Sequence, residues 1–175
     1  MKIDSGNLQQ LILKYKNIQN KLIPKIVEAE ASTLIDLLDK GFRTQTDPYG
    51  LKWPANNDGS RFDKAGTIRD SFSSSYTNNT ATIESSLDFA SFHQRGTNHL
   101  PRRRMIPDNG YGKWEGPIKR TARQVIEDLL EGRDKTYTSK RATRIARRAA
   151  NRLLARRRAA ERAYNRRVKR REDLE

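Results

Sequence analysis

The residues whose types could do chemistry are mainly arginines and lysines, and they concentrate at the C-terminal end of the chain. Residues 139–175 hold fifteen Lys and Arg against four acidic residues, which makes +11 of the formal net charge of +15. Such a density of positive charge repels itself in the free chain and is stabilised against a polyanion or an acidic protein surface. The segment therefore predicts binding to one of these two partners.

The distribution of these cations favours contacts with phosphate groups over contacts with bases. They fall on nearly every face of one expected helix, which suits sequence-independent DNA binding that weakens steeply with salt. Tyr164 is the only aromatic residue within that helix, so stacking on single strands fits poorly. An acidic protein surface is the alternative partner. The candidate residues here are Arg141, Arg144, Arg148, Arg152, Arg156, Arg157, Arg158, Arg162, Arg166, Arg167, Lys169, Arg170 and Arg171.

Residue types that catalyse reactions or bind metals are sparse. His93 and His99 are the only imidazoles, and neither has the spacing of a metal pair or an obvious nucleophile and orienting acid. Gly110, Gly112 and Gly116 follow no expected strand and lack the Lys-Ser/Thr pair of a phosphate-binding loop. The chain has no Cys. The sequence therefore predicts no enzyme, no cofactor and no metal site.

Length and composition predict one folded domain and an appendage. The chain has 175 residues, and its basic end holds too few apolar residues for a second core. We expect an α+β domain over residues 1–135 and an Arg-rich helical extension over residues 136–175. There is no apolar run of ~18 residues and no apolar segment after a charged start, so we expect neither a membrane span nor a secretory signal. The absence of Cys is typical of intracellular assembly.

A low hydrophobic content, 34% of residues, predicts that neighbouring subunits or a partner supply part of the stability. Apolar residues recur at helical spacing from Leu8 to Leu22, with Ser5 or Asp4 placed to cap the helix. Pro24 either kinks this helix or begins a second one. The apolar face then continues to Gly41, a typical helix C-terminus.

The middle of the chain is typical of loops and a β-hairpin. Turn-forming residues fill 44–60. Two alternating runs, 71–77 and 80–86, flank Asn78-Asn79, and Asn tolerates the positive φ of a tight hairpin turn. One or two helical turns are expected over Asp88–Gln94, before Gly96. A short extended piece follows over 100–107.

A second helical pattern begins near Pro117 and ends at Gly132. Its expected buried face comprises Ile118, Ala122, Val125, Ile126, Leu129 and Leu130. Thr138 or Ser139 can cap a long Ala/Arg helix through about Arg171, since both residue types favour helix. The fold class is therefore α+β: N-terminal helices packed on a small antiparallel sheet, followed by a helix and a long basic C-terminal helix.

Five motifs between about residues 41 and 110 occur in an order that carries a resemblance. They are Phe42-Arg43-Thr44, then Asp47-Pro48-Tyr49-Gly50 with Trp53, then Ile68-Arg69-Asp70-Ser71, then Phe89 to Gly96, and finally Leu100-Pro101-Arg102-Arg103. In this order they resemble the phage virion morphogenesis family, the tail completion proteins of Mu-like and P2-like phages. The chain departs from that family at Arg104–Pro107, where the family has an aromatic residue, Leu and Gly at the end of a strand.

The resemblance implies a structural virion protein of the head–tail junction, a tail completion or neck protein. Such proteins have a small α+β fold and assemble as rings, commonly of six copies, around the DNA channel. The implied partners are neighbouring neck, portal-adaptor and tail proteins, with assembly in the host cytoplasm. The basic extension would contact DNA or an acidic neighbouring subunit. A free-standing, non-specific DNA-binding protein is the alternative function.

The resemblance also implies roles for particular residues of the motifs. Trp53, Phe89 and Phe92 are expected most simply in the core, with a subunit contact as the alternative. His93 and Gln94 are expected to hold local turns or a subunit contact by hydrogen bonds. Three consecutive cations, Arg102, Arg103 and Arg104, are expected to face the DNA channel or a neighbouring acidic subunit.

Overall fold

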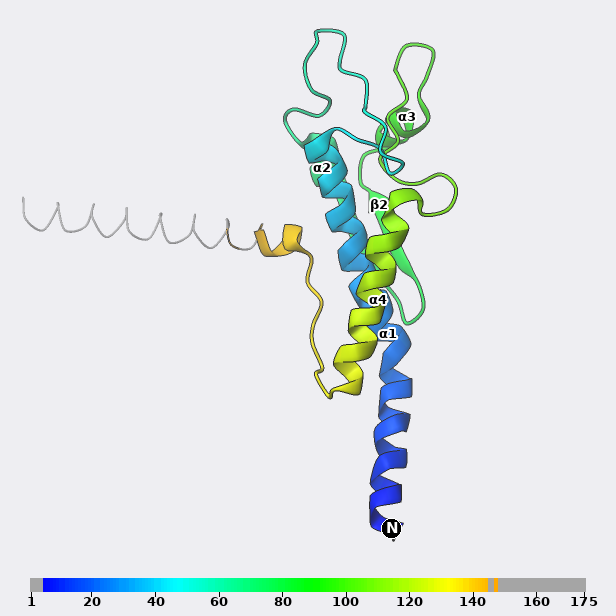
Figure 1. The fold of residues 1–175 in the computed structure, drawn as a ribbon. Helices are drawn as coiled ribbons and strands as arrows, with labels where there is room; N and C mark the ends of the chain where they lie inside the picture. Colours follow the sequence, from blue (N-terminus) through cyan, green and yellow to red (C-terminus); the bar gives the residue numbers. More distant parts are fainter. Residues whose placement is uncertain (1–4, 145–146, 148–175) are drawn as a thin grey trace, which may run out of the picture. The chain divides into compact units, whose positions relative to one another are not determined.

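The fold lies in the first of two units, Met1–Ser139 and Lys140–Glu175. A computed structural model describes residues 5–144 and Arg147. The elements are α1 (Ser5–Thr44), α2 (Thr67–Ser71), β1 (Phe72–Tyr76), β2 (Ala81–Ser85), α3 (Ala90–Arg95), a 3-10 turn η1 (Gly112–Trp114) and α4 (Glu115–Leu130) (Figure 1). The described chain is therefore mixed, with helices and one small antiparallel sheet.

The N-terminal segment forms one continuous helix, α1. The sequence was compatible either with one kinked helix or with two helices that meet at Pro24. The helix passes through Pro24, although the missing N–H of this residue removes one hydrogen bond. It continues because the residues on both sides of Pro24 share one buried face. It also continues past Gly41, where we expected it to end, because Phe42 is part of the core. Gln45 ends the helix instead: its φ is +54°, and its Nε2 donates to the carbonyl of Phe42 at 2.7 Å.

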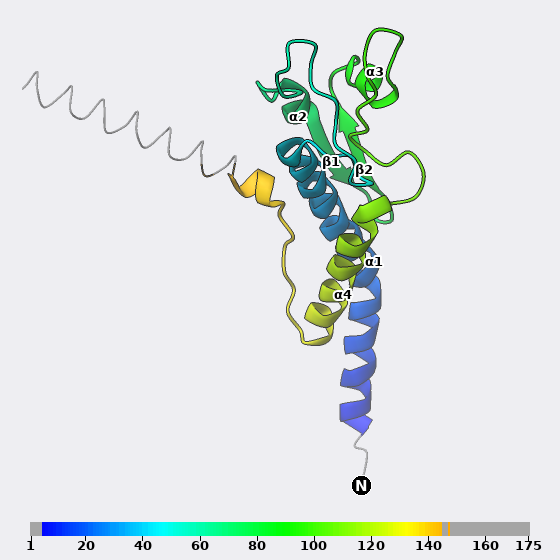
Figure 2. The ribbon, with the colours of Figure 1, turned by 45° about the horizontal axis from the view of Figure 1, so that its top comes forward.

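The hairpin expected around Asn78-Asn79 is present, and it packs on α1. Phe72 pairs with Ser85 and Tyr76 with Ala81 in an antiparallel register. One face of the hairpin, including Phe72 and Ile83, contacts the core, and Figure 2 shows both strands beside α1. The alternation of small polar and apolar residues thus predicted this hairpin and its solvent-exposed face.

Two clusters of buried residues hold the fold together, and α1 contributes to both. The larger cluster surrounds Phe42, whose ring lies 5.1 Å from that of Trp53 and 6.0 Å from that of Phe62. The smaller cluster joins Ala29 of α1 to Val125 and Leu129 of α4. Because α1 packs against both the hairpin and α4, it is the central element of the unit.

Two expectations about the second half of the unit are wrong. Ile126 and Leu130, expected on the buried face of α4, are exposed, and Asp128 is buried instead. Residues 100–107 form no strand. Pro101 and Pro107 have no N–H to donate to a ladder, and side-chain hydrogen bonds to this segment take the place of strand pairing.

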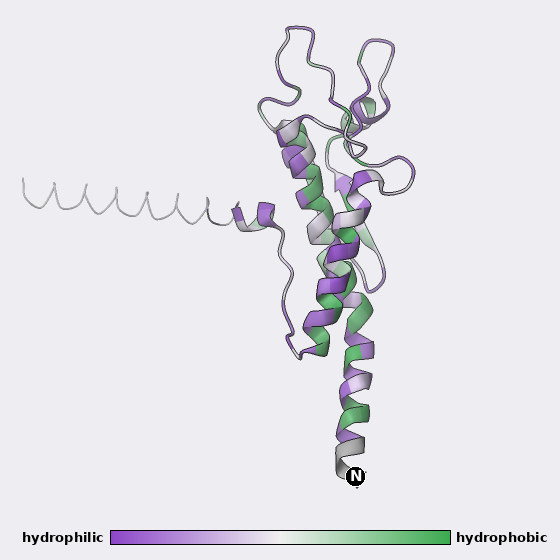
Figure 3. Ribbon diagram, in the orientation of Figure 1, coloured by the Kyte–Doolittle hydropathy of each residue, from purple (hydrophilic) through white to green (hydrophobic). Residues whose placement is uncertain are grey.

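The N-terminal part of α1 extends beyond the end of α4 (Figure 1). Apolar and polar residues alternate around this projecting part, as Figure 3 shows. Large apolar side chains at Leu11, Ile12, Leu13 and Tyr15 are exposed there. No helix in residues 5–144 combines the length and the apolar content needed to cross a membrane.

Candidate functional site

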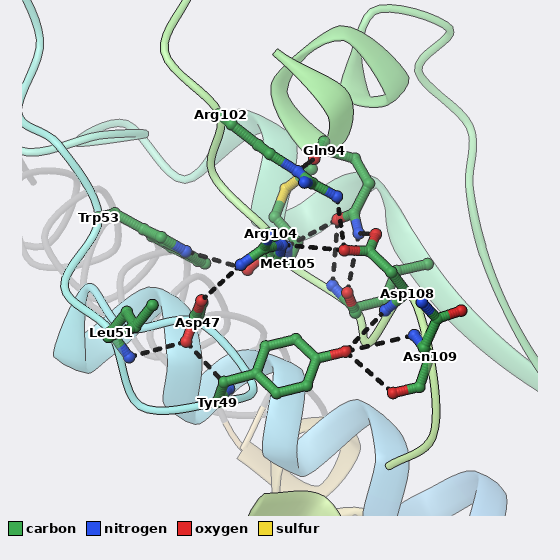
Figure 4. A network of polar contacts seen from close by, with 11 residues as sticks. Asp47, Tyr49, Leu51, Trp53, Gln94, Arg102, Arg104, Met105, Asp108 and Asn109 are labelled. Carbon is green, nitrogen blue, oxygen red and sulfur yellow. Dashed lines mark hydrogen bonds and ion pairs between the residues drawn. The ribbon is translucent and has the colours of Figure 1, made fainter. Parts of the chain in front are cut away.

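The loop after α1, residues 45–53, is closed by a single carboxylate. Asp47 Oδ1 accepts hydrogen bonds from the N–H of Tyr49 at 2.9 Å and of Leu51 at 2.7 Å (Figure 4). Gly50 adopts a φ of +93°, a conformation that a residue with a side chain rarely tolerates. The Asp-Pro-Tyr-Gly motif therefore encodes a tight, internally bonded turn.

Two aromatic residues of this loop join it to the segment that follows α3. The hydroxyl of Tyr49 accepts from the N–H groups of Asp108 and Asn109 at 3.2 Å and donates to the carbonyl of Asn109 at 3.1 Å. Trp53 is buried, as expected, and its Nε1 donates to the carbonyl of Arg104 at 2.9 Å. Segments about 50 residues apart in sequence thus meet in one place (Figure 4).

Gln94, on α3, holds the same segment through both ends of its amide. Its Oε1 accepts from the N–H groups of Met105 at 2.7 Å and Ile106 at 3.2 Å. Its Nε2 donates to the carbonyl of Ile106 at 2.8 Å and to Asp108 Oδ1 at 3.0 Å. Gln94 therefore organises a local turn, one of the two roles expected for it.

Arg103 is buried, contrary to the expectation that it faces DNA or another subunit. Only 2% of its surface is exposed. Its guanidinium donates to the carbonyls of Pro54 and Ala55, both at 2.9 Å, and lies 4.6 Å from the ring centre of Phe62. Burial lowers the pKa of Arg103. A cation so enclosed stabilises the loop beneath it and cannot reach a phosphate.

Arg102 and Arg104 are partly exposed, but each already has an acidic partner. Arg102 donates to Asp108 Oδ2 at 2.6 Å. Arg104 Nε lies 2.9 Å from the same oxygen, and its Nη1 lies 3.7 Å from Asp47 Oδ2. Their positive charge is thus largely balanced inside the site. Together with Gln94, Asp47 and Tyr49, these residues form what we call the loop network.

His93 is packed against Phe62 and Arg103. Its ring lies 4.8 Å from that of Phe62, and its Nδ1 lies 3.5 Å from Arg103 Nη1. Burial, together with the neighbouring guanidinium, lowers the pKa of His93, so the imidazole is neutral at pH 7. Within residues 5–144 and Arg147, no three His, Asp or Glu side chains gather as a metal site would require.

Phe89 and Phe92 are exposed, so the expectation that they lie in the core is wrong. Helix α3 is only six residues long, and its buried position is Ala90. Beside it, an open groove of about 500 Å³ runs along β2 toward Met105, with Ile83 on its apolar lining. This side of the molecule therefore presents apolar surface of the kind found at protein contacts.

The basic extension lies mostly outside the described residues. Lys140, Arg141 and Arg144 belong to a described helical turn, in which Arg141 is buried and Arg144 half-buried. Arg141 is therefore not displayed to a polyanion in this structure. The other predicted cations, Arg148, Arg152, Arg156, Arg157, Arg158, Arg162, Arg166, Arg167, Lys169, Arg170 and Arg171, lie outside the described residues.

The residues that lead into this extension, 131–139, form a connecting segment that sequence reasoning missed. Tyr137 donates its hydroxyl to Asp128 Oδ2 at 3.0 Å, and its carbonyl accepts from Ser32 Oγ at 2.6 Å. Asp134 pairs with Lys21 at 2.8 Å and with Lys25 at 3.2 Å. The chain is thus fastened along α1 and α4 up to the point where the extension begins.

Asp128 is the centre of this attachment and is 1% exposed. Its Oδ1 accepts from Lys135 at 3.0 Å and from Arg133 at 2.7 Å. These hydrogen bonds hold the pKa of Asp128 well below its usual range. Burial, and then the hydrogen bond to Asp128, raises the pKa of Tyr137 to about 12. The signal in the sequence was an acid at a buried helical position, next to Val125 and Leu129.

Comparison of the chain with protein-family models, curated proteins and solved structures finds no match. The resemblance to the phage family therefore depends on the motifs alone. In chemical terms, the charged side chains of the loop network pair with one another.

Proposed function

We propose that this chain is a structural phage virion protein of the head–tail junction, a tail completion or neck protein. It forms a ring around the DNA channel and joins the tail to the head. The observation that carries this proposal is the loop network. Asp47, Gln94 and Arg102 come from separate motifs of the resemblance, and they are joined through Arg104, which pairs with Asp47, and Asp108, which binds the other two. This convergence supports a fold shared with the phage family, because motifs that matched the family by chance would not be expected to lie close together in the structure.

Two further features support the assembly role. Exposed apolar side chains at Phe92, Leu11 and Tyr15 leave surface for subunit contacts. The attachment of residues 131–139 to α1 and α4 keeps the chain within the folded unit up to the residue where the basic extension begins. A ring of such subunits concentrates its cations near one axis, where DNA or an acidic neighbouring subunit is bound.

Cryo-electron microscopy of purified particles tests this function. We expect the wild-type chain as a ring at the head–tail junction. Truncation after Ser139 keeps the connecting segment and removes only the extension, so we expect the ring to form while head and tail fail to join. Absence of the chain from the particles would exclude the structural role.

The alternative function, non-specific DNA binding by a free-standing protein, is favoured by the charge of +11 on residues 139–175 alone. It predicts that the purified monomer retards random duplex DNA and that the affinity falls steeply with salt. The version truncated after Ser139, with the remaining net charge of +4 (15 − 11), should then lose this binding. A chain that binds DNA equally well without the extension contradicts this alternative.

A further inference from the structure

The face of α1 that contacts α4 continues as an apolar stripe where α4 has ended. Ile18, Leu22 and Ile26 pack partly against the cluster that contains Leu129 of α4. Leu11 and Tyr15 precede them at spacings of four and three residues, so they lie in the same row of the helix. They are 48% and 59% exposed. We call Leu11, Ile12 and Tyr15 the N-terminal stripe.

Among residues 5–144, no segment packs on this part of α1 in a way that would explain its stability. Helices of fewer than ~12–15 residues are marginal in water, and helices in proteins are stabilised chiefly by packing of their apolar face. In Figures 1 and 2 no described segment lies beside the N-terminal end of α1. A second surface is therefore needed to cover the stripe.

The charge of α1 indicates which kind of surface would cover the N-terminal stripe. From Ser5 to Val27, α1 carries four lysines and no acidic residue. Lys21 and Lys25 pair with Asp134, whereas Lys14 and Lys16 flank the stripe and make no ion pair within the described part of the chain. The complementary surface is therefore apolar with acidic side chains at its edge.

The chain itself carries such a surface at the end of α4. Ile126 and Leu130, one helical turn apart, are 38% and 51% exposed. Exposed Glu127 and Glu131 lie beside them, with Glu131 also paired to Arg133. On the earlier turns of the same helix, Glu115 is paired with Lys119, and Arg120 and Arg123 add positive charge. We call Ile126, Glu127, Leu130 and Glu131 the α4 patch.

We infer that the N-terminal stripe of one copy binds the α4 patch of the next copy. The contact is not made within one chain, because Leu11 and Tyr15 stay 48% and 59% exposed while Ile126 and Leu130 stay 38% and 51% exposed. Because the two surfaces differ, the contact is head-to-tail, the type that closes into rings. This inference rests on the proposed ring and adds the surfaces that build it.

The experiment measures the mass of the full chain by sedimentation velocity over a range of concentrations. A stripe variant, Leu11→Ser with Tyr15→Ser, and a patch variant, Ile126→Ser with Leu130→Ser, should each weaken association at least tenfold. Leu51→Ser changes an exposed apolar residue on neither surface and serves as the matched control. Circular dichroism checks that each variant retains its helices.

Mixing the two variants is the sharpest test of a head-to-tail contact. The patch variant keeps its stripe and the stripe variant keeps its patch, so an equimolar mixture should form heterodimers and stop there. Lys14→Glu with Lys16→Glu should likewise weaken association, and added copies carrying Glu127→Lys with Glu131→Lys should restore pairing. A stripe that binds a stripe gives no heterodimer and overturns the inference.

Other results separate this inference from the proposed function. A wild-type oligomer that both variants leave intact overturns the inference and leaves ring assembly to other surfaces. A wild-type chain that is monomeric at all concentrations contradicts both. Stripe-dependent binding to vesicles of phosphatidylserine and phosphatidylcholine, without self-association, would identify a membrane surface as the partner and overturn the inference.

Discussion

Gln94 and Asp128 each form hydrogen bonds with several groups at once. Gln94 bonds the backbone of Met105 and Ile106, and Asp128 accepts hydrogen bonds from the side chains that hold the connecting segment. Buried polar groups without partners are costly, so such residues stabilise loops that contain little regular structure.

Replacement of Gln94 by Ala should lower the free energy of unfolding by ~1–3 kcal/mol, because the N–H groups of Met105 and Ile106 lose their acceptor. Urea denaturation measures this change. Gln19→Ala, at an exposed position on α1, is the matched control and should alter stability by less than ~0.5 kcal/mol. Equal stabilities of the two variants would show that water replaces the amide of Gln94.

Asp128 should make the fold sensitive to acid. Its pKa is lower in the folded chain than in the unfolded one, so its contribution is present above about pH 4 and is lost as the pH falls further. Asp128→Asn should therefore destabilise the protein most at pH 7 and progressively less below pH 4. Urea unfolding at pH 7 and pH 3 measures this convergence. Asp88→Asn, on an exposed loop, should have little effect at either pH.

At the scale of elements, α1 organises the unit because it supplies residues to both buried clusters. Its length could not be predicted from local signals: Pro24 and Gly41 are typical helix boundaries, yet both lie inside the helix. Packing of Phe42 and its neighbours outweighs the local preference of Gly41 to end a helix. The hairpin was predictable, because its alternation and its Asn-Asn turn agree with its burial.

Pro24→Ala should stabilise the protein by ~1–3 kcal/mol, because a helical alanine restores the missing backbone donor and has a higher helix propensity. Thermal unfolding followed by circular dichroism measures the shift. Asn20→Ala, on the preceding turn, should add at most ~0.7 kcal/mol. A loss of stability in Pro24→Ala would mean that the two halves of α1 need the bend to reach their partners.

At the scale of the whole molecule, the connecting segment decides where the folded unit ends. The sequence places the boundary between residues 135 and 136, whereas contacts divide the chain after Ser139. Ser139 itself is buried, and Tyr137 packs beside the smaller cluster. The folded unit therefore includes the first residues of what composition alone assigns to a basic tail.

Two truncations distinguish these boundaries. A chain that ends at Ser139 should unfold at nearly the full-length temperature. A chain that ends at Gly132 leaves Asp128 buried without Arg133, Lys135 or Tyr137, so its Tm should be lower by on the order of 5 °C. Differential scanning calorimetry compares the two. Identical values would show that the connecting segment contributes nothing to stability.

The sequence alone determined the features that depend on local pattern. Helical periodicity located α4, alternation located the hairpin, and composition located the basic extension, because each is a property of neighbouring residues. The tertiary structure decided which polar residues face inward. Arg103 and Asp128 are buried, whereas Phe92 and Leu130 are exposed, although residue type alone favours the reverse. Burial depends on which distant segments pack together: Arg103 is enclosed by Pro54, Ala55 and Phe62, and Asp128 by the connecting segment that follows α4.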